Sequence, residues 1–314
     1  MNYIVFDLEW NQSPIGKKGE NPELPFEIIE IDAVKLNEER EILDTFRALV
    51  RPVLYTRLHS GTSAVIGLRE KDLRNGIPFR EAAEAFFKWC GEDVRFCTWG
   101  TTDLTELQRN LKFYGLLDYI KGPVFYEDVQ KLFAIAFETK KNRRSLKYAV
   151  EYLELPENGE FHFAKEDAVY TAMILQKIPE DVLRYFSIDC CQNPKTRDEE
   201  IFVRFDKYEK FISREFETRE ELLLNAEVTA VHCFECRKNV KRVVRWFADS
   251  NGNHLAVGLC PKHGFVKSKL RIREAVDGKF YAIRTTKLIN EAEAGEIRGK
   301  RAFLKVKRQN RRKK

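Results

Sequence analysis

The 314-residue sequence predicts a protein of the α/β class, with a layered domain over residues 1–185 and a smaller β-rich domain over residues 228–290. Three observations lead to this prediction. Three apolar segments follow one another near the start, apolar segments then alternate with segments of helical period, and a strand-rich segment further along carries two pairs of Cys or His residues. A chain of this length also exceeds the usual size of one core.

The expected strands and helices give the first domain its order. Strands are expected over residues 2–10, 26–36 and 41–50, and their short connections are typical of an antiparallel meander. Another buried strand is expected over residues 94–99. Helices are expected over residues 78–90, 103–113, 145–153 and 167–178, with one more introduced by residues 124–129 and ending near residue 136.

The first strand carries two carboxylates, Asp7 and Glu9, inside an otherwise apolar run. Residues i and i+2 of a strand point to the same face, so the two side chains are expected to stand side by side. Neighbouring carboxylates repel each other unless a cation compensates them, and oxygen ligands suit Mg²⁺ or Mn²⁺. Two acids also occur at strand ends that bind nothing, so this pair alone leaves both interpretations open.

Three further residues lie where strands meet helices. Asp103 follows Trp99-Gly100 at the start of an expected helix, and His162 and Asp167 lie around the start of another. Taken singly, an acid there is most simply a helix N-terminal residue, and a lone His is a surface or capping residue. Their combination with Asp7 and Glu9 changes that interpretation.

Together, Asp7-Leu-Glu9, Asp103 and His162-x4-Asp167 resemble the three motifs of the DEDDh 3′–5′ exonucleases. That family includes ribonuclease T, the proofreading subunit of DNA polymerase III and the Eri-like exoribonucleases. The segments Glu27-Ile-Ile-Glu30 and Ser145-Leu-Lys-Tyr-Ala149 fall in the family's order. The resemblance covers about residues 1–180 and implies a ribonuclease H-like mixed sheet flanked by helices.

The resemblance also implies roles for these residues. Asp7, Glu9, Asp103 and Asp167 would bind two divalent cations, Mg²⁺ or Mn²⁺, which stabilise the attacking water and the departing 3′-oxygen. His162 would deprotonate the water, and an unperturbed pKa of ~6.5 suits that task. The expected product is a nucleoside 5′-monophosphate. Single-stranded RNA is the favoured substrate, because Phe6-Asp-Leu-Glu9 with Glu27-Ile-Ile-Glu30 looks closer to the Eri-like group.

Candidate substrate contacts lie beside these motifs. Trp10 either stacks on the terminal base, which contributes ~1–3 kcal/mol, or packs in the core. Arg144 and Lys147 lie near the start of an expected helix and are candidates for contacts with backbone phosphate.

The second domain is expected to bind zinc. Cys233-x2-Cys236 and Cys260-x2-His263 enclose 23 residues, a spacing typical of a structural zinc ribbon with one Zn²⁺. Thiols that meet by chance are the alternative. Cys90, Cys97, Cys190 and Cys191 lack such pairing and are interpreted as structural or free thiols.

Charge is distributed unevenly along the chain. The net charge of +6 combines −10 over residues 1–232, +8 over 233–273, −2 over 274–297 and +10 over 298–314. This favours a polyanionic partner bound through the C-terminal part, although a merely solubilising tail is also possible. Basic and aromatic residues alternate on two expected hairpins, at Arg242, Arg245, Trp246, Lys267, Lys269, Arg271, Phe280 and Tyr281.

Residues 186–227 are expected to form a helical junction, with a helix over residues 201–216, and residues 291–314 a basic tail that is disordered from about Lys305. No apolar stretch approaches ~18 residues, and no basic leader precedes the first strand, so a cytoplasmic protein is expected. The alternatives are a DNA exonuclease in repair and a non-catalytic RNA-binding protein. The presence of all five motif residues argues against the latter.

Overall fold

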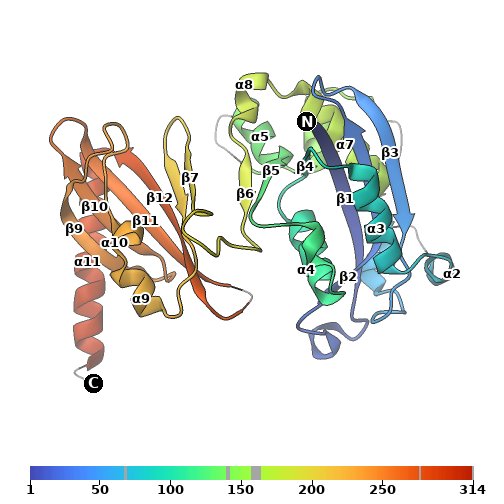
Figure 1. Ribbon diagram of the computed structural model, residues 1–314, viewed down its shortest axis with the longest axis horizontal. Helices are drawn as coiled ribbons and strands as arrows, with labels where there is room; N and C mark the ends of the chain where they lie inside the picture. The colour runs from blue at the N-terminus through green and yellow to red at the C-terminus, as the bar shows by residue number, and fades with distance from the viewer. Residues whose placement is uncertain (67–68, 139–141, 157–163, 276, 313–314) are drawn as a thin grey trace. The chain divides into compact units, whose positions relative to one another are not determined.

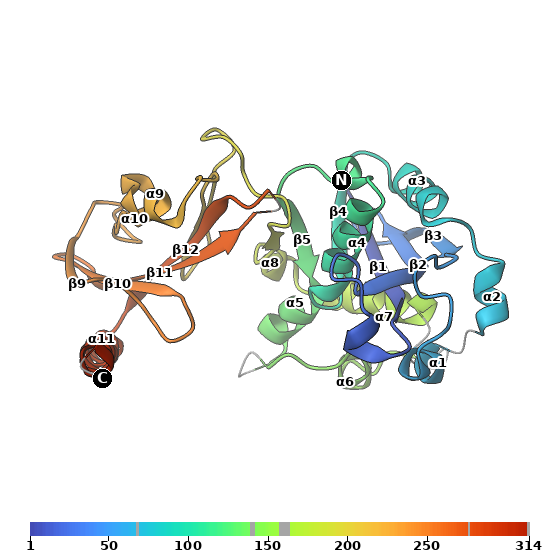
Figure 2. The same cartoon turned by 90° about the horizontal axis from the view of Figure 1, so that it is seen from below.

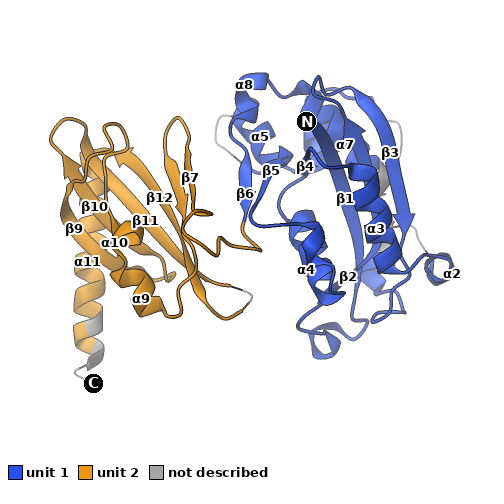
Figure 3. Cartoon of the chain, viewed as in Figure 1, with its two compact units in different colours: residues 1–189 blue, residues 190–314 orange. Residues whose placement is uncertain are grey.

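The computed structural model describes residues 1–312 apart from residues 67–68, 139–141, 157–163 and 276 (Figure 1). The chain divides into unit 1, residues 1–189, and unit 2, residues 190–314 (Figure 3). Each unit has its own sheet and its own apolar clusters.

Unit 1 contains a six-stranded mixed sheet of order β3-β2-β1-β4-β5-β6. β1 pairs antiparallel with β2 and parallel with β4, so the chain switches direction beside the first strand. The strands are β1 (Asn2–Gln12), β2 (Phe26–Leu36), β3 (Ile42–Leu49), β4 (Val94–Thr98), β5 (Val124–Asp128) and β6 (Ser187–Asp189).

Helices cover both faces of this sheet (Figure 2). Alternation along β1 explains the two layers, because Ile4, Phe6 and Leu8 pack on one side and Tyr3 and Val5 on the other. The first side is covered by α3 (Phe79–Cys90) and α4 (Thr102–Phe113), and the second by α5 (Val129–Ala136), α6 (Leu146–Tyr152) and α7 (Ala164–Lys177). The remaining elements are η1 (Gly16–Gly19), α1 (Ser60–Ile66), α2 (Glu70–Arg74), η2 (Leu117–Tyr119) and α8 (Glu180–Leu183).

Unit 2 is built on an antiparallel sheet of order β7-β8-β12-β11-β10-β9. Its elements are β7 (Ile201–Arg204), β8 (Glu209–Ile212), α9 (Arg219–Leu224), α10 (Ala226–Thr229), β9 (Lys241–Ala248), β10 (His254–Cys260), β11 (Gly264–Glu274), β12 (Phe280–Ile289) and α11 (Glu291–Arg312). The predicted α/β class, with a mixed sheet flanked by helices and a second β-rich part, is confirmed.

Two sequence predictions in this unit are wrong. The helix predicted over residues 201–216 is the β7–β8 hairpin, whose second strand pairs with β12. The helix-like spacing of its apolar residues arises at the turn, where Phe205 and Tyr208 stack with ring centroids 4.6 Å apart. Residues 305–312, which were predicted to be disordered, belong to α11, and this helix packs against the sheet through Ala294 and Ile297.

The described helices include none that is both long and apolar enough to cross a membrane.

Candidate active site and metal centre

Unit 1 brings together the four carboxylates predicted from the sequence. Asp7 and Glu9 lie on β1, Asp103 in the first turn of α4, and Asp167 in α7. The N–H of Leu8 donates to Asp103 Oδ1 at 3.3 Å, which ties the start of α4 to the central strand. The predicted base, His162, lies outside the described residues.

Each of these carboxylates affects the protonation of the others. Burial, followed by the charges of Asp103, Asp167 and Glu9, holds the pKa of Asp7 well above its usual range. Burial and then Asp167 raise the pKa of Glu9 to about 8. The pKa of Asp103 rises to about 7 through burial, although N–H donors that include Leu8 partly offset the increase. The four acids therefore resist ionising together.

The donor set fits divalent cations. The four neighbouring charges that act most strongly on Asp7 all belong to carboxylates. A cluster of carboxylate oxygens without a neutralising side chain is costly in the ionised form, and hard cations such as Mg²⁺ or Mn²⁺ remove that cost.

A second row of acidic residues lies beside the first, and its role was not predicted from the sequence. Asp32 and Glu30 on β2 pair with Asp7 and Glu9 on β1. Arg47 on β3 compensates this row, with Nη2 2.6 Å from Glu30 Oε1 and Nε 3.8 Å from Asp32 Oδ1. The available signal was the presence of two acids two residues apart in the apolar strand after residue 26.

Glu27, in the same strand, has a structural role. Its buried carboxylate accepts hydrogen bonds from the N–H groups of Val53, Leu54 and Tyr55, and from the hydroxyl of Tyr114. It thereby fixes the segment that follows β3 against α4.

The three predicted substrate contacts have partners within the protein. Trp10 follows a β-bulge and packs against the core, with its ring centroid 5.9 Å from that of Phe26. Arg144 Nε bonds Glu138 Oε1 at 3.0 Å, and Lys147 Nζ lies 4.0 Å from Glu151. A contact between either cation and phosphate would have to replace these ion pairs.

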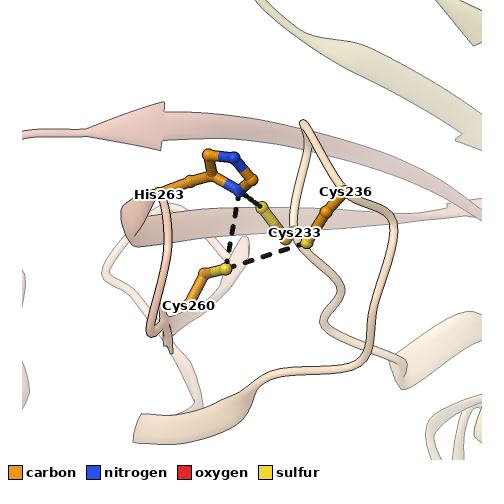
Figure 4. Close-up of side chains that lie close together, drawn as sticks. All are labelled: Cys233, Cys236, Cys260 and His263. Carbon is orange, nitrogen blue, oxygen red and sulfur yellow. Dashed lines mark hydrogen bonds between the residues drawn. The ribbon is translucent and has the colours of Figure 1, made fainter.

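Unit 2 brings together Cys233, Cys236, Cys260 and His263, whose four ligand atoms all lie within 4.8 Å of one another (Figure 4). The Sγ of Cys233 lies 3.4 Å from His263 Nδ1, and the Sγ of Cys260 lies 3.7 Å from the same nitrogen. The two thiols of Cys236 and Cys260 are 3.8 Å apart.

These distances fit a tetrahedral zinc site. Bonds of ~2.3 Å to sulfur and ~2.0–2.1 Å to nitrogen give edges of about 3.8 Å between sulfurs and about 3.6 Å between sulfur and nitrogen. Both ligand pairs sit on tight turns, with positive φ at Arg237 (58°) and at Gly264 (84°). The N–H of Lys262 is the main cause that lowers the pKa of Cys260 to about 6, which favours the thiolate that binds metal.

Comparison with known proteins places unit 1 in a family. Residues 4–175, more than half of the chain, match the family described as Exonuclease, of the ribonuclease T type. This chain is an exonuclease of the ribonuclease T family.

Relatives of this exonuclease share the assignment. It is 27% identical over 183 residues to a probable 3′–5′ exonuclease, KapD, of Bacillus subtilis, covering 58% of this chain and 86% of that protein. It is 24% identical over 176 residues to human 3′–5′ exoribonuclease 1, covering 52% of this chain and 50% of that protein. Both relatives are named as exonucleases that act in the 3′–5′ direction, which is the direction predicted from the sequence motifs.

A solved structure has the same fold. The nuclease domain of 3′hExo, a DEDDh family member bound to rAMP, aligns with a TM-score of 0.50 and 22% identity over 57% of the exonuclease and 92% of that domain. These relatives match little more than half of the exonuclease, so unit 2 has to be interpreted from its own residues.

Proposed function

We propose that this exonuclease removes nucleotides one at a time from the 3′ end of single-stranded RNA and releases nucleoside 5′-monophosphates. The observation that carries the proposal is the convergence of Asp7, Glu9, Asp103 and Asp167, four acids whose pKa values are raised or which raise those of their neighbours. Similarity to a human exoribonuclease supports RNA as the substrate.

In this proposal the four carboxylates hold two divalent cations, Mg²⁺ or Mn²⁺. The cations, when bound, neutralise charge on the scissile phosphate and on the departing 3′-oxygen. Asp7 and Glu9 come from a central strand and Asp103 is anchored by the N–H of Leu8, so three of the ligands are held by the sheet. A rigid ligand set keeps the terminal phosphate in line for attack.

His162 acts as the general base in the same proposal. Its ring nitrogen takes a proton from water as the water oxygen attacks phosphorus, the P–O3′ bond breaks, and the 3′-oxygen leaves with a proton from solvent. The substitution His162→Asn removes the base and leaves all four carboxylates in place.

We expect His162→Asn to lower kcat by roughly a hundredfold or more in steady-state assays, because general base catalysis contributes about 10²–10⁴-fold. The matched control is His254→Asn, which removes an imidazole from β10 in unit 2 and should leave kcat unchanged. If His162→Asn keeps the wild-type kcat, the histidine is not the base.

In unit 2 we propose that Cys233, Cys236, Cys260 and His263 hold one structural Zn²⁺. The support is the fit of the three interatomic distances to tetrahedral edges. The ion would link the segment before β9 to the β10–β11 turn, because Cys233 and Cys236 precede β9 while Cys260 and His263 lie between β10 and β11.

The experiment that tests the function uses 5′-labelled single strands of RNA and DNA, each incubated with the protein and Mg²⁺ or Mn²⁺. We expect a ladder of products shortened from the 3′ end, stronger on RNA, and nucleoside 5′-monophosphates in the supernatant. The control is Asp118→Asn, which removes an acid from η2 outside the carboxylate cluster. A stronger ladder on DNA would replace the RNA assignment, and no ladder on either polymer would refute the proposed activity.

A further inference from the structure

Strand register sorts the side chains of unit 2 onto two faces of its sheet. Along β11, Lys267, Lys269, Arg271 and Arg273 alternate with Val266, Ser268, Leu270 and Ile272. The apolar members of the second set pack in the clusters on one side of the sheet. The four cations therefore lie together on the opposite side.

A neighbouring strand and helix extend this cationic side. Lys287 on β12 pairs directly with Lys267, so both side chains lie on the same face. The pKa of Lys269 is lowered first by burial and then by the positive charges of its neighbours, which include Lys300 on α11. We call Lys267, Lys269, Arg271, Arg273 and Lys287 the basic face.

Neutralisation of the basic face is incomplete. Glu293 on α11 lies 3.6 Å from Lys267 Nζ and 3.3 Å from Lys287 Nζ. Asp249, whose charge reaches Lys269, forms its ion pair with Lys300 at 3.4 Å.

The other cations of the basic face lack such partners. Among the described residues, no ion pair is formed by Lys269, Arg271 or Arg273. On β11 and β12, the described positions that point to this side include no Asp or Glu. Mutual repulsion of three clustered cations is relieved by a polyanion.

The aromatic residues that alternate with these cations in the sequence are not available for stacking. Trp246 donates its indole N–H to the carbonyl of Thr229 and packs among buried residues. Tyr281 is buried and donates its hydroxyl to the carbonyl of Cys190, and Phe280 packs beside Phe216. Recognition on this face therefore depends on charge rather than on base stacking.

We propose that the basic face of unit 2 binds the phosphate backbone of a nucleic acid without reading its sequence, whereas the candidate active site belongs to unit 1. Alternate residues of a strand lie about 6.7 Å apart, so four cations on β11 span about 20 Å. In one strand of a duplex, at about 3.4 Å per nucleotide, that length corresponds to roughly six nucleotides. The proposal rests on the nucleic-acid substrate of the proposed function and adds a second point of attachment for it.

The test is binding of the full chain to a labelled 20-nucleotide single strand, measured by fluorescence anisotropy at several salt concentrations without added Mg²⁺ or Mn²⁺. The variant is Lys269→Gln/Arg271→Gln. We expect about tenfold weaker binding at low salt and a slope of log K against log [salt] that is smaller by about 1.4, since each phosphate contact on a single strand contributes ~0.7. Gel electrophoresis of the recovered strand shows that it stays intact.

Two controls separate this face from net charge and from misfolding. Lys207→Gln/Arg242→Gln removes the same charge elsewhere in unit 2. Lys207 lies in the β7–β8 turn. Arg242 lies on the face opposite to the basic face, because it pairs with Gly258, which in turn pairs with Val266. Lys269→Arg/Arg271→Lys keeps both charges and is expected to bind as the wild type does. Equal weakening by the two Gln variants, or weakening by neither, overturns the proposal.

Vesicles that contain phosphatidylserine provide the comparison with a membrane surface. If Lys269→Gln/Arg271→Gln loses vesicle binding and keeps oligonucleotide binding, the proposal is overturned. Because these measurements need no cleavage, an inactive protein that still binds through the basic face refutes only the proposed function. An active protein whose binding ignores the basic face refutes only this inference.

Discussion

Asp7 suits metal binding but destabilises the metal-free fold. It lies on the central strand, where burial and neighbouring acids raise its pKa, and it pairs across the sheet with Asp32. Without a cation, each acid with a raised pKa holds its proton to a higher pH than it would in the unfolded chain. The same charge cluster that suits metal binding therefore reduces the stability of the metal-free fold as the pH rises.

The pH dependence follows from the sign of these shifts. A carboxyl whose pKa is higher in the folded state than in the unfolded state loses stability as the pH rises from the unfolded value, about 4, to the folded value. For Asp103 and Glu9 the folded values are about 7 and about 8. We expect Mg²⁺ or Mn²⁺ to raise the melting temperature more at pH 8.5 than at pH 6, measured by differential scanning fluorimetry. Equal increments at both pH values would contradict this electrostatic account.

Asp7→Asn is expected to abolish cleavage and to stabilise the metal-free protein. Removing one charge relieves repulsion worth on the order of 1–2 kcal/mol, which corresponds to a melting temperature higher by roughly 2–8 °C at pH 8.5. Asp118→Asn, outside the cluster, is the control and should change neither cleavage nor melting. A lower metal-free melting temperature in Asp7→Asn would show that the carboxylate of Asp7 does not destabilise the fold by repulsion.

Arg47 is the residue whose role the sequence left unpredicted. It compensates Glu30 and Asp32, which are buried beside Glu9 and Asp7. Arg47→Met leaves two buried acids without their cation, at a cost of about 3 kcal/mol in unfolding free energy, measured by urea denaturation. Arg47→Lys should recover part of that loss, whereas equal losses in both variants would indicate that packing, not charge, is responsible.

At the scale of elements, the sequence predicted those parts whose pattern is local. The strand pair of Asp7 and Glu9, the helix start at Asp103 and the two ligand pairs at Cys233 and Cys260 depend on neighbours in sequence, and the structure brings each set together. The β7–β8 hairpin was missed because pairing with β12, some 70 residues away, overrides the local helical spacing. The metal site on the first strand could be predicted only by combining Asp7 and Glu9 with the distant motifs that contain Asp103 and Asp167.

The α11 helix was missed for a different reason. Its apolar residues, of which Ala294 and Ile297 are buried, are outnumbered by charged ones, so the composition resembles that of a disordered tail. Packing on β9, β10 and β11 supplies the stability that composition does not reveal. The alternation of Lys267, Lys269 and Arg271 was visible in the sequence, but Lys287 joins the basic face only through its pairing with Lys267.

The four zinc ligands connect the segment before β9 with the turn between β10 and β11. Cys233→Ser/Cys260→Ser is expected to lose the single zinc ion and to lower the melting temperature of unit 2, measured by elemental analysis and calorimetry. Cys191→Ser, which removes a thiol outside the cluster, is the control and should keep one zinc per chain. Full zinc retention in the double Ser variant would rule out this site.

In the whole molecule, the residues of the candidate active site and most of the positive charge lie in different units. Unit 1 carries a net charge of −7 and unit 2 a net charge of +13, so the family match and the cationic surface belong to different units. Cations in the active site reverse the local charge that a phosphate meets in unit 1. Unit 2 supplies a positive field that does not depend on those cations.

This separation predicts the behaviour of residues 1–189 alone. Unit 1 has its own sheet and two apolar clusters, so we expect it to fold and to shorten oligonucleotides from the 3′ end. Without the positive field its KM should rise by roughly tenfold or more at low salt, with kcat largely kept, in steady-state assays. An unchanged KM would show that unit 2 does not hold the substrate.

The central claim is that Asp7, Glu9, Asp103 and Asp167 hold the catalytic cations. The most direct measurement is anomalous diffraction from a crystal soaked in Mn²⁺, with data collected on both sides of the manganese absorption edge. The account predicts two manganese peaks ligated by these four carboxylates, and none in a crystal of Asp7→Asn/Asp167→Asn. Manganese bound elsewhere in unit 1, with no peak among the four carboxylates, would contradict it.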